Sequence, residues 1–301
     1  MARTRFIGDA GLTARMTLVM FLLGGLFVAL VAVLAVNSPG IGVIVAVGGI
    51  GLAIYQWSTS DKIAMRAMNA REVSPQEAPE LHGMIDRLCA LADMPKPRVG
   101  IADIAVPNAF ATGRSPDRAV VCVTTGILQT LTAEELEGVL AHELSHVAHR
   151  DVLVMTVASS AGISAGMLTQ GAQYGGLGFM GGGRRDSNSG PPLWIIVLVV
   201  SLVVYAVSFV LLRLLSRYRE LSADRAGAYL TLKPAALASA LQKISGEMSQ
   251  STRRDLRQVN AASALCIAPI NLKGISSTHP PLAKRLEQLA RIQAELDRPT
   301  A

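Results

Sequence analysis

Long apolar runs without charge dominate the hydrophobic and polar pattern of this chain. No Asp, Glu, Lys or Arg occurs between Met16 and Ser60. A single helix needs only about 20 residues to span a bilayer, so this run predicts two spans, near residues 16–36 and 41–57. Asn37-Ser38-Pro39-Gly40 between them is a strong turn signal. We therefore expect residues 1–60 to form an N-terminal transmembrane hairpin.

Two further uncharged stretches occur later in the chain. One contains a clear candidate span from Pro192 to Leu212. The other, residues 152–170, is richer in Gly, Ser and Thr and would cross only as a small-residue helix packed on its neighbours. We interpret 152–212 as a second membrane hairpin with a Gly-rich loop at 171–191. Whether 152–170 fully spans the bilayer stays open.

Residues 61–151 and 213–301 instead show amphipathic patterns, which predict two parts of one soluble domain. Apolar residues at helical spacing alternate there with short β-like runs bounded by Pro, Asn and Ser. Thr132-Ala-Glu-Glu135 is a capping box, in which the two side chains satisfy each other's backbone amides at a helix start. The predicted elements are helices at 79–94, 132–149 and about 281–296, with strands at 98–104, 109–113 and 119–124.

Composition supports a membrane protein. Hydrophobic residues make up 50% of the chain and charged residues only 17%, whereas soluble domains have about 25% charged residues. The net charge of +6 arises largely from arginines that flank the apolar runs, which is typical of cytoplasmic topology anchors rather than of nucleic-acid binding. The first hairpin's tip carries no positive charge and should face away from the cytoplasm. The flanking arginines are Arg3, Arg5, Arg15, Arg213, Arg217 and Arg219.

Cysteine spacing excludes two kinds of site. The three cysteines, Cys89, Cys122 and Cys266, lie far apart and form no CxxC pair. Neither a disulfide framework nor a thiolate zinc site is therefore predicted, and a reducing compartment fits.

One motif within this pattern carries candidate chemistry. His142-Glu143-Leu144-Ser145-His146 has the form HExxH on a predicted helix. Residues four apart share a helix face, so the two imidazoles can hold one zinc ion while Glu143 reaches its bound water. Zinc lowers the pKa of that water towards about 7, and Glu143 would take its proton and pass it to the leaving amine. The alternative is two histidines on a polar helix face; His149 shares that face, and its role stays open.

A catalytic zinc site needs a third protein ligand and one open coordination position. Glu220 is the best candidate for that ligand, and Asp224 one turn later would accept the free N–H of a ligating histidine. The alternative is that both acids belong to a solvated, charged helix face. The ligand assignment requires His142, His146 and Glu220 to lie on one side of the membrane, so an even number of crossings must separate them.

Taken together, these motifs resemble those of the HtpX-like membrane zinc metalloproteases, relatives of the CAAX prenyl proteases. HExxH alone occurs in many peptidases, whereas the ordered set covers nearly the whole chain. Besides the apolar segments, the set contains Pro107-Asn108-Ala-Phe-Ala-Thr-Gly113, Ala141-His-Glu-Leu-Ser-His146, Ser216-Arg-Tyr-Arg-Glu-Leu-Ser-Ala-Asp224, Ser277-Thr-His-Pro-Pro281 and Arg285.

The resemblance implies a mostly α-helical membrane protein with about four transmembrane helices and an α+β zincin domain of the gluzincin type. It implies one zinc ion per chain. Asn108 would begin an edge strand along which the substrate backbone is laid. His279 and Arg285 would approach the metal and steady the oxyanion, or His279 would cover the zinc in a resting state. By its sequence alone, the segment around His279 is only a helix start with proline in its first turn.

The resemblance also implies a location and a role. We expect a multi-pass protein of a prokaryotic cytoplasmic (inner) membrane whose active site faces the cytoplasm. Its partners would be membrane lipid and polypeptide substrates, namely damaged or misfolded membrane proteins under stress-response quality control.

We therefore expect a zinc endopeptidase with His142, His146 and Glu220 as metal ligands and Glu143 as general base and acid. The alternative function is a non-catalytic membrane scaffold that keeps zinc for stability. A transporter or channel component is disfavoured, because such proteins place ionisable groups inside their spans and the spans predicted here contain none. The physiological substrates, the cleavage preference and the oligomeric state are not predicted.

Overall fold

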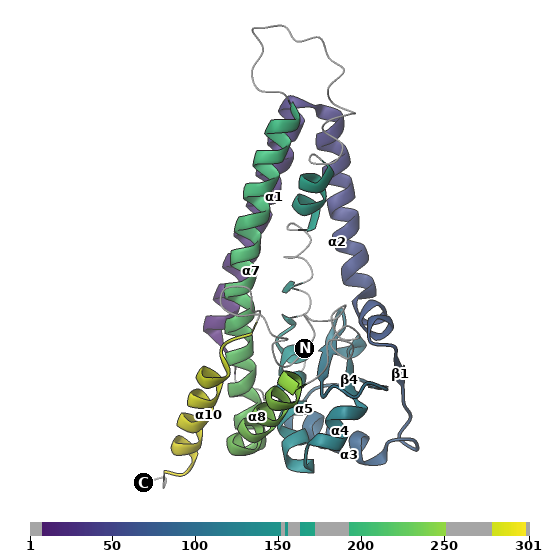
Figure 1. The fold of residues 1–301 in the computed structure, drawn as a ribbon, viewed down its shortest axis with the longest axis vertical. Coiled ribbons are helices and arrows are strands. Elements are labelled where there is room, and N and C mark those ends of the chain that lie inside the picture. Colours follow the sequence, from purple (N-terminus) through teal and green to yellow (C-terminus); the bar gives the residue numbers. More distant parts are fainter. Residues whose placement is uncertain (1–7, 152–153, 156–162, 172–192, 251–278, 299–301) are drawn as a thin grey trace, which may run out of the picture. The chain divides into compact units, whose positions relative to one another are not determined.

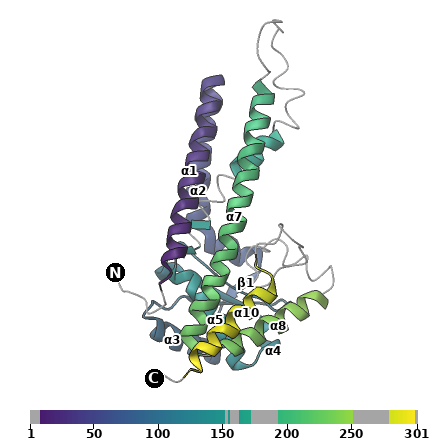
Figure 2. The same cartoon turned by 90° about the vertical axis from the view of Figure 1, so that its left-hand side faces the viewer.

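The computed structural model, shown in two views in Figures 1 and 2, divides the chain into two compact units. It describes residues 8–151, 154–155, 163–171, 193–250 and 279–298. We call the first of the two units the sheet unit; it comprises Met1–Leu12, Thr59–Leu153 and Ser216–Ala301. The second, the apolar unit, comprises Thr13–Ser58 and Val154–Leu215.

Three long helices supply the apolar unit, and each is long and apolar enough to cross a membrane. They are α1 (Ala10–Asn37), α2 (Pro39–Ala67) and α7 (Leu193–Thr231). The fourth predicted span, 152–170, lies partly outside the described residues, as does most of the predicted Gly-rich loop at 171–191. The described residues 163–171 are helical. The buried core of this unit consists of Leu30, Leu34, Ala165, Val197 and Val204.

The helices of the apolar runs are longer than the spans predicted from the sequence. The predicted turn between the first two is reduced to a break at Ser38. Helix α7 continues past the predicted span end at Leu212, because residues 213–231 contain no proline and are mostly good helix formers. It ends where Leu232 adopts a left-handed backbone conformation (φ 55°), shortly before Pro234. One continuous helix therefore carries both the apolar run and the residues around Glu220.

A small sheet forms one layer of the sheet unit. Its strands are ordered β1-β2-β4-β3, with β2 and β4 parallel and the outer pairs antiparallel. The three predicted strands are confirmed with slightly shorter ends, and β1 is an addition because three residues give too short a pattern to detect. Strand β3 lies at an edge of the sheet. The strands are β1 (Ala70–Glu72), β2 (Arg98–Ala102), β3 (Ala109–Thr112) and β4 (Val120–Thr124).

Helices pack around this sheet, and α5 is the central one. It contacts α8, α3 and the strands β3 and β4, while α10 lies beside α8 in both views (Figures 1 and 2). The three helices predicted at 79–94, 132–149 and 281–296 are confirmed within two residues at each end. The helices are α3 (Pro79–Ala92), the 3₁₀ turn η1 (Pro116–Arg118), α4 (Thr125–Thr130), α5 (Ala133–Ala148), α8 (Pro234–Gln250) and α10 (Leu282–Leu296).

The start of α5 is fixed by the predicted capping box. Thr132 Oγ1 accepts from the Glu135 amide at 3.4 Å, and a Glu135 carboxylate oxygen accepts from the Thr132 amide at 2.8 Å. The same carboxylate also binds Lys243 and Ser239 of α8, at 2.7 and 2.6 Å. Because Glu135 is buried, these contacts join the N-terminus of α5 firmly to α8.

Candidate metal centre

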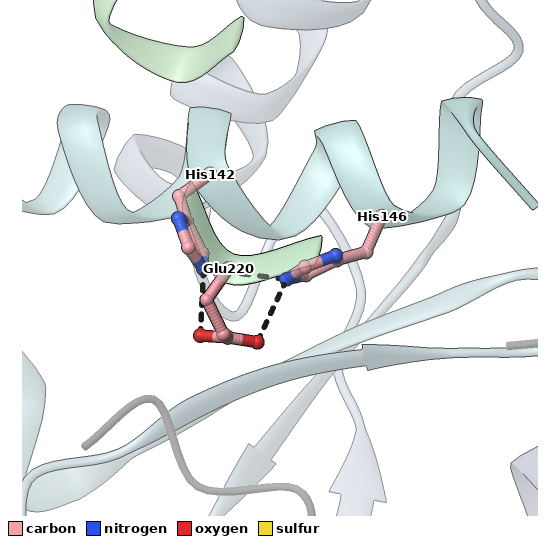
Figure 3. Close-up of side chains that lie close together, drawn as sticks. All are labelled: His142, His146 and Glu220. Carbon is pink, nitrogen blue, oxygen red and sulfur yellow. Dashed lines mark hydrogen bonds and ion pairs between the residues drawn. The ribbon is translucent and has the colours of Figure 1, made fainter. Parts of the chain in front are cut away.

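The C-terminal half of α5 faces α7 inside the sheet unit, and this interface brings the three predicted metal ligands together (Figure 3). His142, His146 and Glu220 are 0%, 6% and 5% exposed, and their donor atoms all lie within 4.8 Å of one another. Gly227 makes this approach possible. A Cβ atom at Gly227 would lie 2.9 Å from the His142 backbone nitrogen, so only glycine lets α7 come this close to α5.

The spacing of the donor atoms fits a tetrahedral zinc ion. The two Nε2 atoms of His142 and His146 are 3.3 Å apart. The Glu220 carboxylate oxygens lie 3.7 Å from His142 Nε2 and 3.6 Å from His146 Nε2. Ligands bound at about 2.1 Å in a tetrahedron are separated by about 3.4 Å. Two imidazoles and one carboxylate therefore match three corners around one ion and leave the fourth corner for solvent or substrate.

His142 is oriented by the acid predicted for that purpose. Asp224 Oδ1 lies 2.9 Å from His142 Nδ1, where the carboxylate favours a ring proton on Nδ1 and an Nε2 atom that faces Glu220. Arg285 grips Asp224 with two parallel hydrogen bonds, from Nε at 2.7 Å and from Nη2 at 2.6 Å. Arg285 Nη1 is also 3.8 Å from a Glu220 oxygen. The structure thus brings Arg285 to the site, where it holds the partner of a ligand.

His279 also reaches the candidate centre. Its Nδ1 atom lies 3.0 Å from Glu220 Oε2, and the side chain is 5% exposed. The residues from 251 to 278 lie outside the described part of the chain. His279 therefore contacts the predicted third ligand, and its imidazole lies beside the carboxylate that would bind the ion.

Glu143 points from α5 towards the sheet. Its Oε2 atom accepts a hydrogen bond of 2.9 Å from the backbone N–H of Ala111 in β3. Burial raises the pKa of Glu143 to about 7; the nearby Glu220 charge adds to this rise and His142 opposes it. A carboxylate with a pKa near neutrality is well suited to accept and return a proton at physiological pH.

Asn108 lies immediately before the edge strand, and its backbone is already used. Its amide donates to Thr124 Oγ1 at 2.9 Å, and its carbonyl accepts from the Thr124 amide at 2.9 Å. Both groups therefore face β4, whereas the Ala111 amide faces the opposite side. The sequence-based expectation placed Asn108 along the substrate. The geometry leaves its backbone unable to pair with an added strand, so the pairing edge begins after Asn108.

The sequence analysis missed Asp151, a charged partner of the candidate metal centre. Asp151 is fully buried, and its Oδ2 atom lies 2.8 Å from His146 Nδ1 and 3.0 Å from Arg219 Nε. The only sequence signal was an acid five residues after the second histidine, just beyond the helix end. Arg219 was interpreted as a topology anchor and here makes an ion pair. His149 caps the C-terminus of α5 and is not part of the described ligand group.

Comparison with known proteins gives consistent matches. The model of "Peptidase family M48" matches residues 75–293. Protease HtpX homolog 1 of Streptomyces coelicolor is 50% identical over 98% of this chain and 97% of its own length. The Protease HtpX homolog of Moorella thermoacetica is 48% identical over 98% and 99%. That of Pyrococcus furiosus is 39% identical over 95% and 98%.

A solved structure also shares the fold. Ste24p of S. mikatae superposes with a TM-score of 0.54 at 19% sequence identity, covering 91% of this chain. This chain spans 64% of the length of that structure. The likeness therefore concerns the architecture, while the family is carried by the sequence matches.

Proposed function

Because this chain belongs to peptidase family M48, we propose that it is a zinc-dependent endopeptidase that cleaves membrane or misfolded proteins on the cytoplasmic side of a prokaryotic inner membrane. A role in protein quality control accords with such substrates. The observation that carries the proposal is the buried group of His142, His146 and Glu220, whose donor atoms have tetrahedral spacing next to Glu143. The proposal includes one zinc ion per chain.

Each residue of the proposed site has a separate role in peptide hydrolysis. When bound, zinc supplies Lewis-acid polarisation and activates water. Glu143 takes a proton from the attacking water and returns it to the leaving amine. Asp224 holds the His142 ring so that Nε2 faces Glu220, where it would bind the ion. The edge of β3 after Asn108, where the Ala111 amide is already bonded to Glu143, offers its remaining outward backbone groups to an extended polypeptide.

His279 and Arg285 complete the proposed site. Both are buried beside Glu220, at 3.0 and 3.8 Å from its Oε2 atom. As N–H donors they can stabilise negative charge that develops on the scissile carbonyl oxygen, which is often the largest catalytic contribution in hydrolases. His279 covers Glu220 in the described geometry, which also fits a resting state in which the imidazole shields the ion.

The proposed membrane side is supported by charge and connectivity. The three candidate spans of the described residues carry no Asp, Glu, Lys, Arg or His in their apolar parts, and arginines flank the runs. His142, His146 and Glu220 belong to one compact unit, so an even number of crossings separates α5 from the Glu220 region of α7. This favours a second crossing by residues 152–170. Polypeptides with unfolded segments next to the membrane would be the preferred substrates.

Replacing Glu143 with Gln tests the proposal directly. The purified full-length protein in detergent should keep its zinc, while cleavage of casein falls by about 10²- to 10⁴-fold, because general acid–base catalysis contributes that much. Glu137→Gln, on the same helix but in an ion pair with Arg87, is the matched control and should cleave normally. Equal cleavage by the Glu143→Gln protein and the wild type would remove Glu143 from the mechanism. Retained zinc with no cleavage by either protein would favour the zinc-stabilised scaffold.

A further inference from the structure

We propose that Asp151, held in place by Arg219, is a positioning residue of the metal centre that orients His146 and ties it to the helix that supplies Glu220. The inference rests on the proposed zinc site. It assigns a role to two residues that the ligand set and the general base do not account for.

The contacts form a chain of three side chains. His146 Nδ1 lies 2.8 Å from Asp151 Oδ2, and Arg219 Nε lies 3.0 Å from the same oxygen. Asp151 is 0% exposed and the Arg219 side chain 12%. Asp151 Oδ2 is the nearer partner of His146 Nδ1, at 2.8 Å, while Arg219 Nη2 lies 3.5 Å from the same nitrogen. The carboxylate therefore favours the ring proton on Nδ1 and directs the Nε2 lone pair at the metal position, and the Arg219 charge balances the carboxylate. Such carboxylates restrict the ring orientation and raise the basicity of the ligating nitrogen.

The local backbone brings Asp151 back under the helix that carries His146. Helix α5 ends at Ala148, His149 is its C-cap, and Arg150 adopts a left-handed conformation with φ 56°. This conformation is uncommon for a residue other than glycine, asparagine or aspartate. It turns the chain so that Asp151 lies beside the last turn of α5 instead of continuing away from it. The contact therefore depends on a specific turn and is not a consequence of helix spacing.

The two ligating histidines are then supported in parallel ways from different elements. His142 is held by Asp224 and Arg285, from α7 and α10. His146 is held by Asp151 and Arg219, from the segment after α5 and from α7. Arg219 directly precedes Glu220 in the sequence. The pair Asp151–Arg219 thus fixes the distance between His146 and the third ligand as well as the angle of the imidazole ring.

Zinc affinity measures this role without relying on cleavage. The apo form of the full-length protein in detergent would be titrated with Zn²⁺ against a competing chelator, for the wild type, Asp151→Ala and Asp151→Asn. We expect Asp151→Ala to raise the zinc dissociation constant by about 10- to 100-fold, as loss of such partners usually does. Asp151→Asn keeps a weaker, neutral acceptor and should raise it by about threefold to tenfold. The visible spectrum of the Co²⁺-loaded proteins should change in the same order.

Glu135→Ala is the matched control. Glu135 is also a buried acid of the α5 region that binds a cation on another helix, but it lies at the far end of α5 from the metal ligands. It should lower the melting temperature and leave the zinc dissociation constant within twofold of the wild type. A merely structural role for Asp151 would likewise lower the melting temperature without changing zinc affinity or the cobalt spectrum.

Three results would overturn the proposal. These are wild-type zinc affinity in Asp151→Ala, equal weakening by Glu135→Ala, or, should the alanine protein not fold, an unchanged affinity and cobalt spectrum in Asp151→Asn. Since zinc binding is read separately from hydrolysis, positioning by Asp151 can fail while the peptidase function stands. Conversely, equal cleavage by the Glu143→Gln protein and the wild type would count against the proposed mechanism and would leave the zinc measurements interpretable.

Discussion

At the scale of single residues, the loss of Arg285 should destabilise the fold strongly. It is 2% exposed and grips the fully buried Asp224 with two hydrogen bonds. Arg285→Ala would leave a buried carboxylate without its cation, which typically costs about 3–5 kcal/mol. We expect that loss in the free energy of unfolding, measured by denaturant titration in detergent. A change below about 1 kcal/mol would contradict the geometry.

Arg291 on the same helix provides the control for that experiment. It pairs with Glu287 one turn away, and both side chains are well exposed. Exposed ion pairs contribute about 0–1 kcal/mol, so Arg291→Ala should hardly change the unfolding transition. Comparing the two substitutions shows how much of the loss in unfolding free energy is due to burial of the ion pair rather than to removal of one positive charge.

The lowered pKa of Glu135 predicts how the stability of the fold depends on pH. Burial alone would raise its pKa, but hydrogen bonds to Lys243, Ser239 and the Thr132 amide lower the pKa to about 2 from an ordinary 4.5. The folded state therefore binds this proton more weakly than the unfolded chain. The stabilisation is complete above pH 4.5 and is lost as the pH falls towards 2.

The wild type should accordingly be more stable than Glu135→Gln at pH 7, by about 1–3 kcal/mol for a buried charge-assisted bond. At pH 3 the difference should be smaller. Urea unfolding of both proteins at the two pH values measures this. A difference that stays constant, or grows on acidification, would mean that Glu135 does not titrate with a lowered pKa in the folded state.

At the scale of elements, the close approach of α7 to α5 depends on Gly227. A methyl group there would meet the backbone of His142 at 2.9 Å, and a backbone cannot move aside as a flexible side chain can. Gly227→Ala should therefore force the two helices apart, with a loss of about 1–3 kcal/mol in stability, as overpacking usually costs. Because the ligands sit on these two helices, we also expect weaker zinc binding in the same titration.

Gly83→Ala is the corresponding control. Gly83 lies in α3, where an added Cβ meets nothing within 4 Å. Alanine there should stabilise the protein by up to about 1 kcal/mol, because glycine is a poor helix former. If Gly227→Ala behaved like Gly83→Ala, the helices would not be held at the described distance.

Elements with strong local patterns were predictable from the sequence. The capping box at Thr132 fixed the start of α5, and runs of apolar residues gave β2, β3 and β4. Two kinds of feature were not predictable. Strand β1 and helix α4 are too short to show a period. The contact between Asp151 and His146 depends on a left-handed turn at Arg150, for which an arginine gives no sequence signal.

At the scale of the whole molecule, the arrangement of positive charges predicts an orientation in the membrane. The break between α1 and α2 should lie outside the cytoplasm and the sheet unit inside it. Gly40→Cys and Gly83→Cys place a thiol on each side at positions with nothing within 4 Å. Both proteins also carry Cys266→Ser. In intact cells whose cytoplasmic membrane can be reached by the reagent from outside, a membrane-impermeant maleimide should label Gly40→Cys.

Gly83→Cys should react only after the cells are lysed. Cys89 and Cys122 are buried and should stay unlabelled in both proteins. The reverse pattern of labelling would place the candidate metal centre on the opposite side of the membrane and overturn the proposed cytoplasmic activity.

Glu220, the candidate ligand that lies far from HExxH in the sequence, could be predicted because zinc coordination limits which residue types can complete the site. Once HExxH is recognised, a tetrahedral ion demands one more ligand, and Glu220 offers it with Asp224 in helical register. The sequence pattern did not predict that α7 continues without a break from the apolar stretch into the Glu220 region. The composition changes from apolar to charged at residue 213, but the helix continues. The fourth predicted crossing falls partly outside the described residues.

The order of the ligands along the chain has a consequence for biosynthesis. His142 and His146 leave the ribosome early, but Glu220 follows the apolar run of α7 and is made only after that run. On the proposed ligand set, a nascent chain that stops before α7 has two of the three ligands and lacks the carboxylate that would complete the metal site. Proteolytic activity should therefore be acquired only after the apolar run of α7 has been synthesised, so an unfinished chain should not degrade neighbouring proteins.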